Sequence, residues 1–207
     1  MTADQGNVDQ GNVDQGSVDQ GSVEPELEIR PLLPAEADDA AVAGTVTDLV
    51  NEVYRDGEKG LWLGDVPRTT PTEVAGLIRA GEIVVARLGA RIVGSVRIQR
   101  LDAETGEFGL LAAATAHHGG GIGRRLVAFA EQQSRDGGCV TMQLELLVPR
   151  VGTHPAKARL AEWYGRLGYR VVRAGSLEED FPHLAPLVAM PCDFLIYHKD
   201  LLAPASP

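Results

Sequence analysis

Hydrophobic and polar residues follow two different periods along residues 27–199. Residues 27–30 alternate apolar and polar side chains and stop at Pro31, which predicts a first strand. Residues 35–54 carry valines at helical spacing, which predicts a helix. By the same criteria, further helices are expected over 71–81, 121–135 and 155–167, and further strands over 82–88, 92–101, 107–114, 140–148, 169–173 and 193–199. The order β-α-α-β-β-β-α-β-α-β-β is typical of an α/β protein in which helices cover a mixed sheet.

Two of these helices have ends that their own residues mark. Thr70 suits an N-cap, Pro71 suits the first helical position, and Glu73 stands where it closes a capping box. Gly168 follows the last periodic residue of the 155–167 helix, where a glycine commonly ends a helix.

The first 26 residues differ in composition from the rest of the chain. Residues 6–24 repeat a five-residue unit, GNVDQ or GSVDQ, in which one valine is the only apolar side chain. Burial of one valine in each unit does not offset the conformational entropy that the chain would lose on folding. We therefore expect residues 1–26 to be disordered. We expect one folded domain over residues 27–202 and a flexible C-terminus over residues 203–207.

Charge and composition narrow the classes of partner. The formal net charge is −10, of which −6 lies in residues 1–26, so the remainder is only mildly acidic and a nucleic-acid partner is disfavoured. The sequence has neither an apolar run of membrane-spanning length nor a signal-peptide pattern, and we expect no membrane partner. Its two cysteines form no disulfide framework or zinc motif, so we expect a cytoplasmic protein without a metal.

The candidate chemistry lies in residues 107–125, where a strand leads through a glycine-rich turn into a helix. Helix N-termini present unpaired N–H groups, and glycines let a ligand approach the main chain, so this segment predicts a phosphate or diphosphate site. A Walker motif is excluded because Arg124 and Arg125, with no serine or threonine, follow Gly123. Arg124 also stands where the third glycine of a dinucleotide-binding motif belongs. A plain strand-to-helix turn is the alternative interpretation.

Two motifs resemble those of one known family. His118-Gly119-Gly120-Gly121-Ile122-Gly123 is similar to the Gln/Arg-x-x-Gly-x-Gly/Ala motif of the GNAT (Gcn5-related N-acetyltransferase) superfamily. Residues 161–169 resemble that superfamily's late Tyr-x-x-Leu-Gly-Phe/Tyr segment, and the order of elements over residues 27–199 is also similar. The resemblance implies the GNAT fold, with strands 107–114 and 140–148 splayed apart, and an enzyme that uses acetyl-CoA and no metal.

The resemblance also implies which residues bind acetyl-CoA. Pantetheine would pair with the main chain of one strand, and the diphosphate would lie on main-chain N–H groups of the glycine-rich turn. The implied residues are Leu111, Ala112, Ala113, His118, Gly119, Gly120, Gly121, Ile122, Gly123 and Arg124. Three positions depart from the family pattern, namely His118, Thr115 in place of a frequent proline, and Lys157 in place of a common asparagine.

By the same resemblance, Tyr164 is the general acid and Glu107 the general base. A tyrosine is protonated at neutral pH and can supply a proton to a departing thiolate. The alternatives are a core aromatic residue for Tyr164 and an exposed strand-end carboxylate for Glu107. Glu145 competes for the role of base, because a carboxylate in the middle of an apolar strand is costly unless it faces a polar cleft.

The residues expected around the acceptor do not determine its chemical identity. Glu58, Trp62 and Glu145 are the candidate acceptor contacts, and the carboxylates suit a cationic amine, whereas Arg68 suits an anionic group equally well. A single compact domain favours a small-molecule amine, and the resemblance implies direct transfer in a ternary complex. The alternatives are a CoA-binding regulatory module without turnover and an acetyltransferase of protein N-termini or lysines, and a homodimer is also open.

Overall fold

The computed structural model describes residues 26–117 and 120–203, and its strands follow the predicted order. The expectations for residues 1–25, His118, Gly119 and residues 204–207 lie outside this described part. The strands are β1 (Leu27–Pro31), β2 (Ile83–Leu88), β3 (Arg91–Arg100), β4 (Thr105–Ala113), β5 (Thr141–Pro149), β6 (Arg170–Ser176) and β7 (Cys192–Asp200).

The helices also occur where the sequence predicts them, with short additional turns. The α-helices are α1 (Ala40–Gly57), α2 (Pro71–Arg79), α3 (Ile122–Asp136), α4 (Pro155–Arg166) and α5 (Leu177–Asp180). The 3-10 helices are η1 (Pro34–Asp38), η2 (Thr115–His117) and η3 (Ala185–Leu187). Neither α5 nor η3 was expected, because each is too short to show a hydrophobic period.

Two details of the helix prediction are wrong. The expected helix over 35–54 is divided into η1 and α1, because the Asp39 carboxylate accepts a hydrogen bond from Ala41 N at 2.8 Å and starts a new helix there. The capping box of α2 is only half formed. The Thr70 hydroxyl accepts from Glu73 N at 3.2 Å, whereas the Glu73 carboxylate accepts from the Thr69 hydroxyl at 2.9 Å instead of reaching back to the N-cap.

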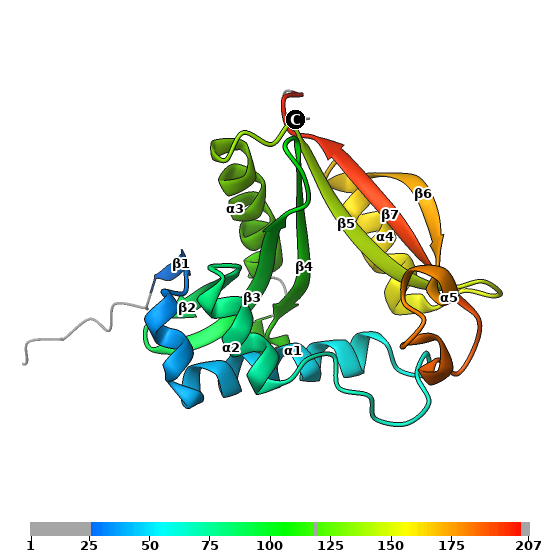
Figure 1. The fold of residues 1–207 in the computed structure, drawn as a ribbon, viewed down its shortest axis with the longest axis horizontal. Helices are drawn as coiled ribbons and strands as arrows, with labels where there is room; N and C mark the ends of the chain where they lie inside the picture. The colour runs from blue at the N-terminus through cyan, green and yellow to red at the C-terminus, as the bar shows by residue number, and fades with distance from the viewer. Residues whose placement is uncertain (1–25, 118–119, 204–207) are drawn as a thin grey trace, which may run out of the picture.

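The strands form one seven-stranded mixed sheet in the order β1-β2-β3-β4-β5-β7-β6. Neighbouring strands run antiparallel, except that β4 and β5 are parallel. The β4–β5 ladder contains three residue pairs, from Thr105↔Thr141 to Glu107↔Gln143. Beyond that point the two strands diverge, and α1 with the segment after it crosses the open end (Figure 1). The predicted splay of the central strands is therefore confirmed.

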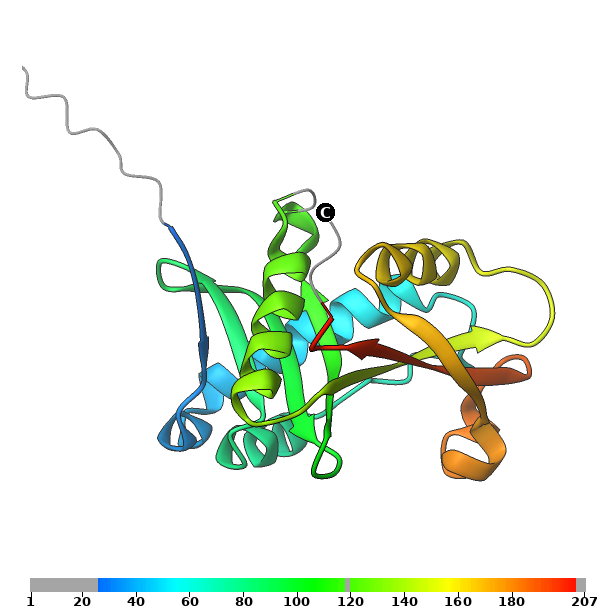
Figure 2. The same ribbon diagram turned by 90° about the horizontal axis from the view of Figure 1, so that it is seen from above.

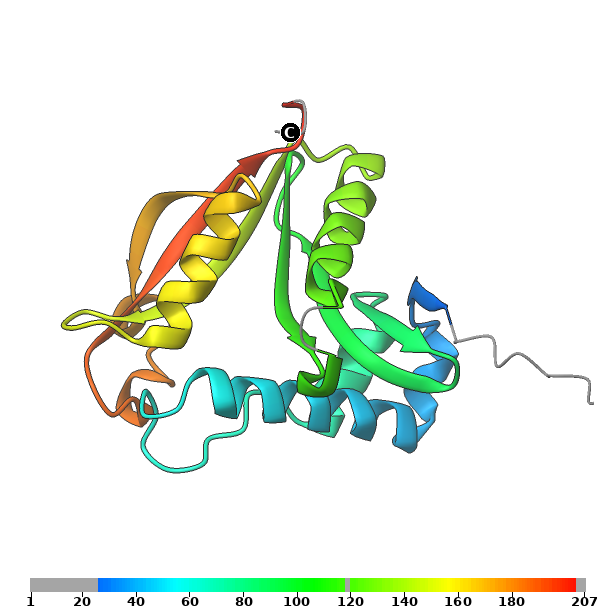
Figure 3. The same ribbon diagram turned by 180° about the vertical axis from the view of Figure 1, so that it is seen from behind.

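The helices cover both faces of this sheet. Helices α1 and α2 lie on one face, and α3 and α4 lie on the other, with α3 against β2, β3 and β4 and α4 against β5 (Figures 2 and 3). Among the described residues, no helix is both long enough and apolar enough to cross a membrane.

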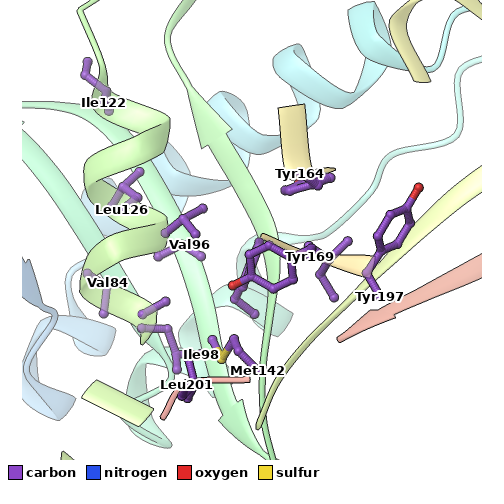
Figure 4. Close-up of a cluster of buried hydrophobic side chains, with 14 of the residues drawn as sticks. Val84, Val96, Ile98, Ile122, Leu126, Met142, Tyr164, Tyr169, Tyr197 and Leu201 are labelled. Carbon is purple, nitrogen blue, oxygen red and sulfur yellow. The ribbon is translucent and has the colours of Figure 1, made fainter. Parts of the chain in front are cut away.

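Each face of the sheet has its own hydrophobic core. The core on the α3–α4 face extends from Ile122 and Leu126 of α3 to the rings of Tyr164, Tyr169 and Tyr197 (Figure 4). The core under α1 and α2 is built from small and branched apolar side chains. Because the helices are fixed on both faces by these cores, the gap between β4 and β5 can stay open without collapse.

Candidate active site

The divergence of β4 and β5 leaves a cavity on each face of the sheet. A cavity of about 650 Å³ lies on the α1–α2 side, where Glu107, Gln143 and Trp62 line it. A second cavity of about 400 Å³ lies on the α4 side, where Leu111, Lys157 and Tyr164 line it. The residues common to both linings are Tyr54, Glu58, Arg68, Glu145 and Phe194. The two cavities therefore meet at the gap between the strands.

A β-bulge in β4 shapes this gap. Arg97 of β3 pairs with Gly109, and Ser95 pairs with Ala112, so Leu110 and Leu111 together oppose a single residue of β3. Leu110 has a φ of 47°, a left-handed conformation that a leucine rarely adopts. A bulge bends its strand and interrupts the ladder. This bulge bends β4 beyond the point at which β4 and β5 stop pairing. Leu111, which follows Leu110 in the bulge, lines the second cavity.

Glu107 is held on the α1–α2 side by two amides. Its Oε1 accepts a hydrogen bond from Gln99 Nε2 at 2.6 Å, and its Oε2 accepts from Gln143 Nε2 at 2.8 Å. The next residue, Phe108, is buried in the opposite core, because successive side chains of a strand point to opposite faces. The sequence position of Glu107 thus places its carboxylate in the larger cavity with a fixed orientation.

The two glutamines belong to a longer hydrogen-bonded chain. The Arg97 guanidinium donates to Glu82 Oε2 at 2.7 Å and to Gln99 Oε1 at 2.6 Å. On the other side, His198 Nε2 and Gln143 Oε1 lie 2.9 Å apart, and since an amide oxygen only accepts, the ring nitrogen is the donor. These contacts fix each glutamine with its N–H group toward Glu107.

Tyr164 reaches the gap from the other face. It is 7 % exposed, its ring packs between those of Phe108, Trp163, Tyr169 and Tyr197, and it lines the smaller cavity. Burial raises the pKa of Tyr164 well above its usual range, and Tyr54 and Tyr197 add to the shift. Within the described part of the chain, its hydroxyl makes no hydrogen bond. The group is therefore a protonated donor whose proton is available to a ligand.

Glu58 is part of a buried ion pair. Its Oε1 lies 2.7 Å from Lys157 Nζ of α4, and its Oε2 accepts from Trp62 Nε1 at 2.6 Å. Burial lowers the pKa of Lys157, an effect that Glu58 partly offsets. The expectation that Glu58 contacts a cationic acceptor is thus not supported, because both of its oxygens are already used by protein groups. Lys157, which replaces a common asparagine of the family, has a structural partner.

The other two candidate acceptor contacts lie at the cavities. Trp62 is half-buried, lines the larger cavity, and pairs through its main chain with Val188. It is therefore both part of the wall and anchored to the protein. Glu145 is exposed and lines both cavities, so its position in the middle of β5 places it toward a polar cleft.

The N-terminus of α3 presents its main chain as the glycine-rich segment predicts. Gly121 is the N-cap with a φ of 72°, a conformation that glycine adopts without strain. The helical ladder begins with the bond from Arg125 N to Gly121 O at 3.0 Å, so the N–H groups of Ile122, Gly123 and Arg124 precede it. Gly120 also lies in the described part, whereas His118 and Gly119 do not. Within the described residues, these three N–H groups have no acceptor in the helical ladder, and such groups at a helix start fit a diphosphate.

Comparison with known protein families identifies the domain. Residues 79–171 match the acetyltransferase (GNAT) domain family. The chain contains a GNAT acetyltransferase domain. The matched residues include β4, β5 and α4, which contribute to the linings of the two cavities, and also the start of α3.

Solved structures share the fold of this GNAT domain at low sequence identity. An aminoglycoside 6'-N-acetyltransferase complexed with coenzyme A has a TM-score of 0.63 and 15 % identity, over 86 % of this chain and 99 % of that one. The protein yncA from Salmonella typhimurium, with acetyl-CoA, has a TM-score of 0.58 and 16 % identity, over 88 % and 98 %. Ard1 from Thermoplasma volcanium has a TM-score of 0.58 and 13 % identity, over 86 % and 99 %. No curated protein sequence matches this chain.

Several residues of the site in this GNAT domain were not found from the sequence. Gln99, Gln143 and His198 come from three different strands, and only the sheet register brings them to Glu107. The one available signal was a glutamine in each of two strands, β3 and β5. Tyr54 was only the last residue of a predicted helix, yet it lines both cavities. Burial raises its pKa, partly offset by Arg68 and by the Leu111 N–H.

Proposed function

We propose that this protein is an N-acetyltransferase that transfers the acetyl group of acetyl-CoA directly to the primary amine of a small molecule. The observation that carries the proposal is the meeting of two cavities at the opened sheet. Glu107 lines one cavity and Tyr164 lines the other, so a base and an acid approach the same gap from opposite faces. A reaction between two substrates in one ternary complex needs this arrangement.

The smaller cavity and the start of α3 form the proposed acetyl-CoA site. The N–H groups of Gly120, Gly121, Ile122, Gly123 and Arg124 would hold the diphosphate, together with those of His118 and Gly119. The main chain of Leu111, Ala112 and Ala113 would hold the pantetheine, since β4 has no described strand partner on its β5 side beyond Glu107. Structural neighbours named as complexes with coenzyme A or acetyl-CoA support this assignment. When bound there, acetyl-CoA supplies a thioester as the acyl donor.

Glu107 acts in the proposal as the general base. An alkylammonium group has no lone pair for attack, so Glu107 takes its proton, directly or through water, and leaves a neutral amine nucleophile. The N–H groups of Gln99 and Gln143 fix the two carboxylate oxygens during this step. Glu145 lines both cavities and is the alternative base.

Tyr164 acts in the proposal as the general acid. As the new C–N bond forms and the C–S bond breaks, its hydroxyl gives a proton to the departing sulfur. The proton that the acylated nitrogen loses restores the hydroxyl through solvent, so the products are the amide and coenzyme A. Burial keeps this hydroxyl protonated because it raises the Tyr164 pKa, and the site needs no metal for either proton transfer.

Calorimetry with acetyl-CoA, followed by thiol release against a panel of primary amines, tests the function. We expect wild-type protein to bind acetyl-CoA and to release coenzyme A with at least one small amine. E107Q should keep that binding and lose about 10²- to 10⁴-fold in kcat, the usual contribution of a general base. E104Q is the matched control, because Glu104 is an exposed residue of the turn before β4.

Other results would contradict the proposal in distinguishable ways. Binding of acetyl-CoA with no thiol release for any amine would indicate a CoA-binding module without turnover. Acetylation of added protein N-termini or lysines but not of small amines would indicate a protein acetyltransferase. Full activity of E107Q with low activity of E145Q would assign the base to Glu145.

A further inference from the structure

Hydrogen-bond donors are few where the two cavities meet. Of the described residues that line both cavities, Glu58, Glu145 and Phe194 present carboxylates and an apolar ring, whereas Tyr54 and Arg68 carry donor groups. The thioester and the amine of the proposed reaction come together at this junction. Acyl transfer places a negative charge on the carbonyl oxygen, and donors held in place before the reaction stabilise that charge. The side chains shared by both linings therefore offer two candidates for this role.

Tyr54 reaches the junction from the last turn of α1. This helix crosses the open end of the sheet, and Tyr54 packs half-buried against the core under α1 and α2 (Figure 1). Asn51, one turn earlier, accepts hydrogen bonds from Arg68 N at 2.8 Å and from Thr69 N at 3.0 Å. The main chain of Arg68 is thereby fixed beside α1, and its guanidinium stands over the Tyr54 ring, with Cζ 5.1 Å from the ring centroid. The ring is thus held in position before a ligand binds.

The hydroxyl oxygen of Tyr54 receives two hydrogen bonds. One comes from the Leu111 N–H, at the bulge of β4, and the other comes from the Arg68 guanidinium. A tyrosine hydroxyl has two acceptor positions and one proton, so with both positions occupied it can act on a further group only as a donor. Because Tyr54 lines both cavities, a ligand at their junction can be that group.

These contacts also change what the bulge offers to a ligand. In the proposed acetyl-CoA site the main chain of Leu111 lies beside the pantetheine arm, yet its N–H is already used by Tyr54. The hydroxyl of Tyr54 takes the place of this main-chain donor. Hydrogen bonds in a chain strengthen one another, so the two bonds that the oxygen accepts make its O–H a better donor. Burial raises the pKa of Tyr54, and the hydroxyl keeps its proton at neutral pH.

We propose that Tyr54 is a further catalytic residue, whose hydroxyl donates a hydrogen bond to the thioester carbonyl oxygen of acetyl-CoA. The inference rests on the proposed function of the same site. As the amine nitrogen bonds to the carbonyl carbon, an electron pair of the C=O double bond moves to the oxygen. The Tyr54 hydroxyl stabilises this oxyanion and keeps its own proton. When the double bond forms again, the C–S bond breaks and Tyr164 protonates the sulfur.

The variant Y54F tests this role by kinetics and calorimetry. It keeps the ring beside Arg68 and removes only the hydroxyl, so we expect kcat to fall about 10²- to 10³-fold, the usual cost of one lost oxyanion donor. The dissociation constant of coenzyme A, which has no thioester carbonyl, should equal that of wild type. Y197F is the matched control, because Tyr197 is also buried but lies outside the linings of both cavities.

Infrared difference spectroscopy tests the hydrogen bond itself, and it needs no amine. Acetyl-CoA with an isotope label at the thioester carbonyl carbon is bound to each protein, and the spectrum with unlabelled acetyl-CoA is subtracted. A hydrogen bond weakens a C=O bond, so we expect the band of the bound thioester at a lower frequency in wild type and Y197F than in Y54F. Only folded protein with bound ligand gives this band, so a lower melting temperature of Y54F does not obscure the result.

Any one of three results would overturn the inference while the proposed function stands. The first is a carbonyl band at the same frequency in wild type and Y54F, and the second is an unchanged kcat in Y54F. The third is an equal loss of affinity for coenzyme A and acetyl-CoA, which would place Tyr54 at a part that both ligands share. A band shift that depends on Tyr54, without turnover of any amine, supports the hydrogen bond and overturns the proposed transfer. Absence of acetyl-CoA binding to wild type overturns both.

Discussion

Lys157 Nζ lies 2.7 Å from Glu58 Oε1, and both side chains are only 5 % exposed. Lys157 belongs to α4, and Glu58 follows the last turn of α1, so the pair joins two elements across the open end of the sheet. Trp62 Nε1 occupies the second carboxylate oxygen at 2.6 Å, which satisfies the buried acid. The pair thereby ties together the walls of the two cavities on either side of the gap.

Breaking this pair from one side should destabilise the protein more than removing both charges. K157M leaves the Glu58 carboxylate buried without a countercharge, and we expect the free energy of unfolding to fall by about 3–5 kcal/mol. The double variant K157M/E58Q should recover most of that loss, because the amide oxygen of its new side chain still accepts from Trp62. Urea unfolding measures both, with exposed Lys59→Met as control. A double variant less stable than K157M would contradict this account.

Gln143 should act on the rate through Glu107. Q143L removes one of the two N–H donors that fix the Glu107 carboxylate, and we expect kcat to fall about tenfold, as for one lost hydrogen bond. The KM for acetyl-CoA should not change, because Gln143 lines only the larger cavity. Steady-state kinetics with a saturating amine measure both constants. Q132L, on the exposed face of α3, is the control; a changed KM with an unchanged kcat would show that Gln143 has no positioning role.

Tyr164 should remain a proton donor to high pH. Burial raises its pKa above the ordinary value near 10, so the group keeps its proton as the pH rises, and the rate should not fall below pH 10 through its ionisation. Y164F should lower kcat about 100-fold at every pH. Its free energy of unfolding should change by less than about 0.5 kcal/mol, since the hydroxyl makes no hydrogen bond within the described chain. An alkaline decline in rate that Y164F abolishes would contradict the raised pKa, and a kcat of Y164F equal to that of wild type would refute the role of general acid.

Gly94 should be needed for the position of α3. A Cβ built on Gly94 would lie 2.8 Å from Ile122 Cγ2 and 3.0 Å from Leu126 Cδ1, closer than carbon atoms pack. We expect G94A to lower the free energy of unfolding by about 1–3 kcal/mol and to weaken acetyl-CoA binding, because the displaced first turn of α3 carries the proposed diphosphate site. Calorimetry and thermal unfolding measure the two effects.

The matched control for this variant is G76A. A Cβ on Gly76, inside α2, would meet no atom within 4 Å, so alanine should stabilise the helix by about 0.5–1 kcal/mol. Acetyl-CoA affinity equal to wild type in G94A would separate Gly94 from the donor site.

Glu36 should make the protein sensitive to acid. Its hydrogen bonds with Arg30 come first among the causes that lower its pKa from 4.5 to about 2. A lowered folded-state pKa stabilises the protein above the unfolded value, and that contribution disappears as the pH falls from about 4.5 to 2. Urea unfolding at pH 6 should show E36Q less stable than wild type by about 1 kcal/mol, and the gap should close near pH 2. E28Q, at an exposed site, should show no such gap; a constant gap would contradict the linkage.

Local order along the chain was determined by the sequence. Alternation and helical spacing gave the elements in their correct order, because each depends on neighbours a few residues apart. The glycines before α3 predicted its exposed N–H groups for the same reason. The sequence did not predict the short helix α5 or the helix break at Asp39. A helix of one turn cannot be distinguished from a loop by its pattern, and the break cannot be distinguished from a longer helix.

Only the tertiary structure decided how distant residues meet. Sheet register brings Gln99 and Gln143 to Glu107, and the open gap brings Arg68 and Tyr164 to adjoining cavities. In the folded chain, Glu58, which the sequence predicted as an acceptor contact, is the ion-pair partner of Lys157. Contacts between residues this far apart carry no periodic signal, so chemical function at the gap depends on packing that only the folded chain defines.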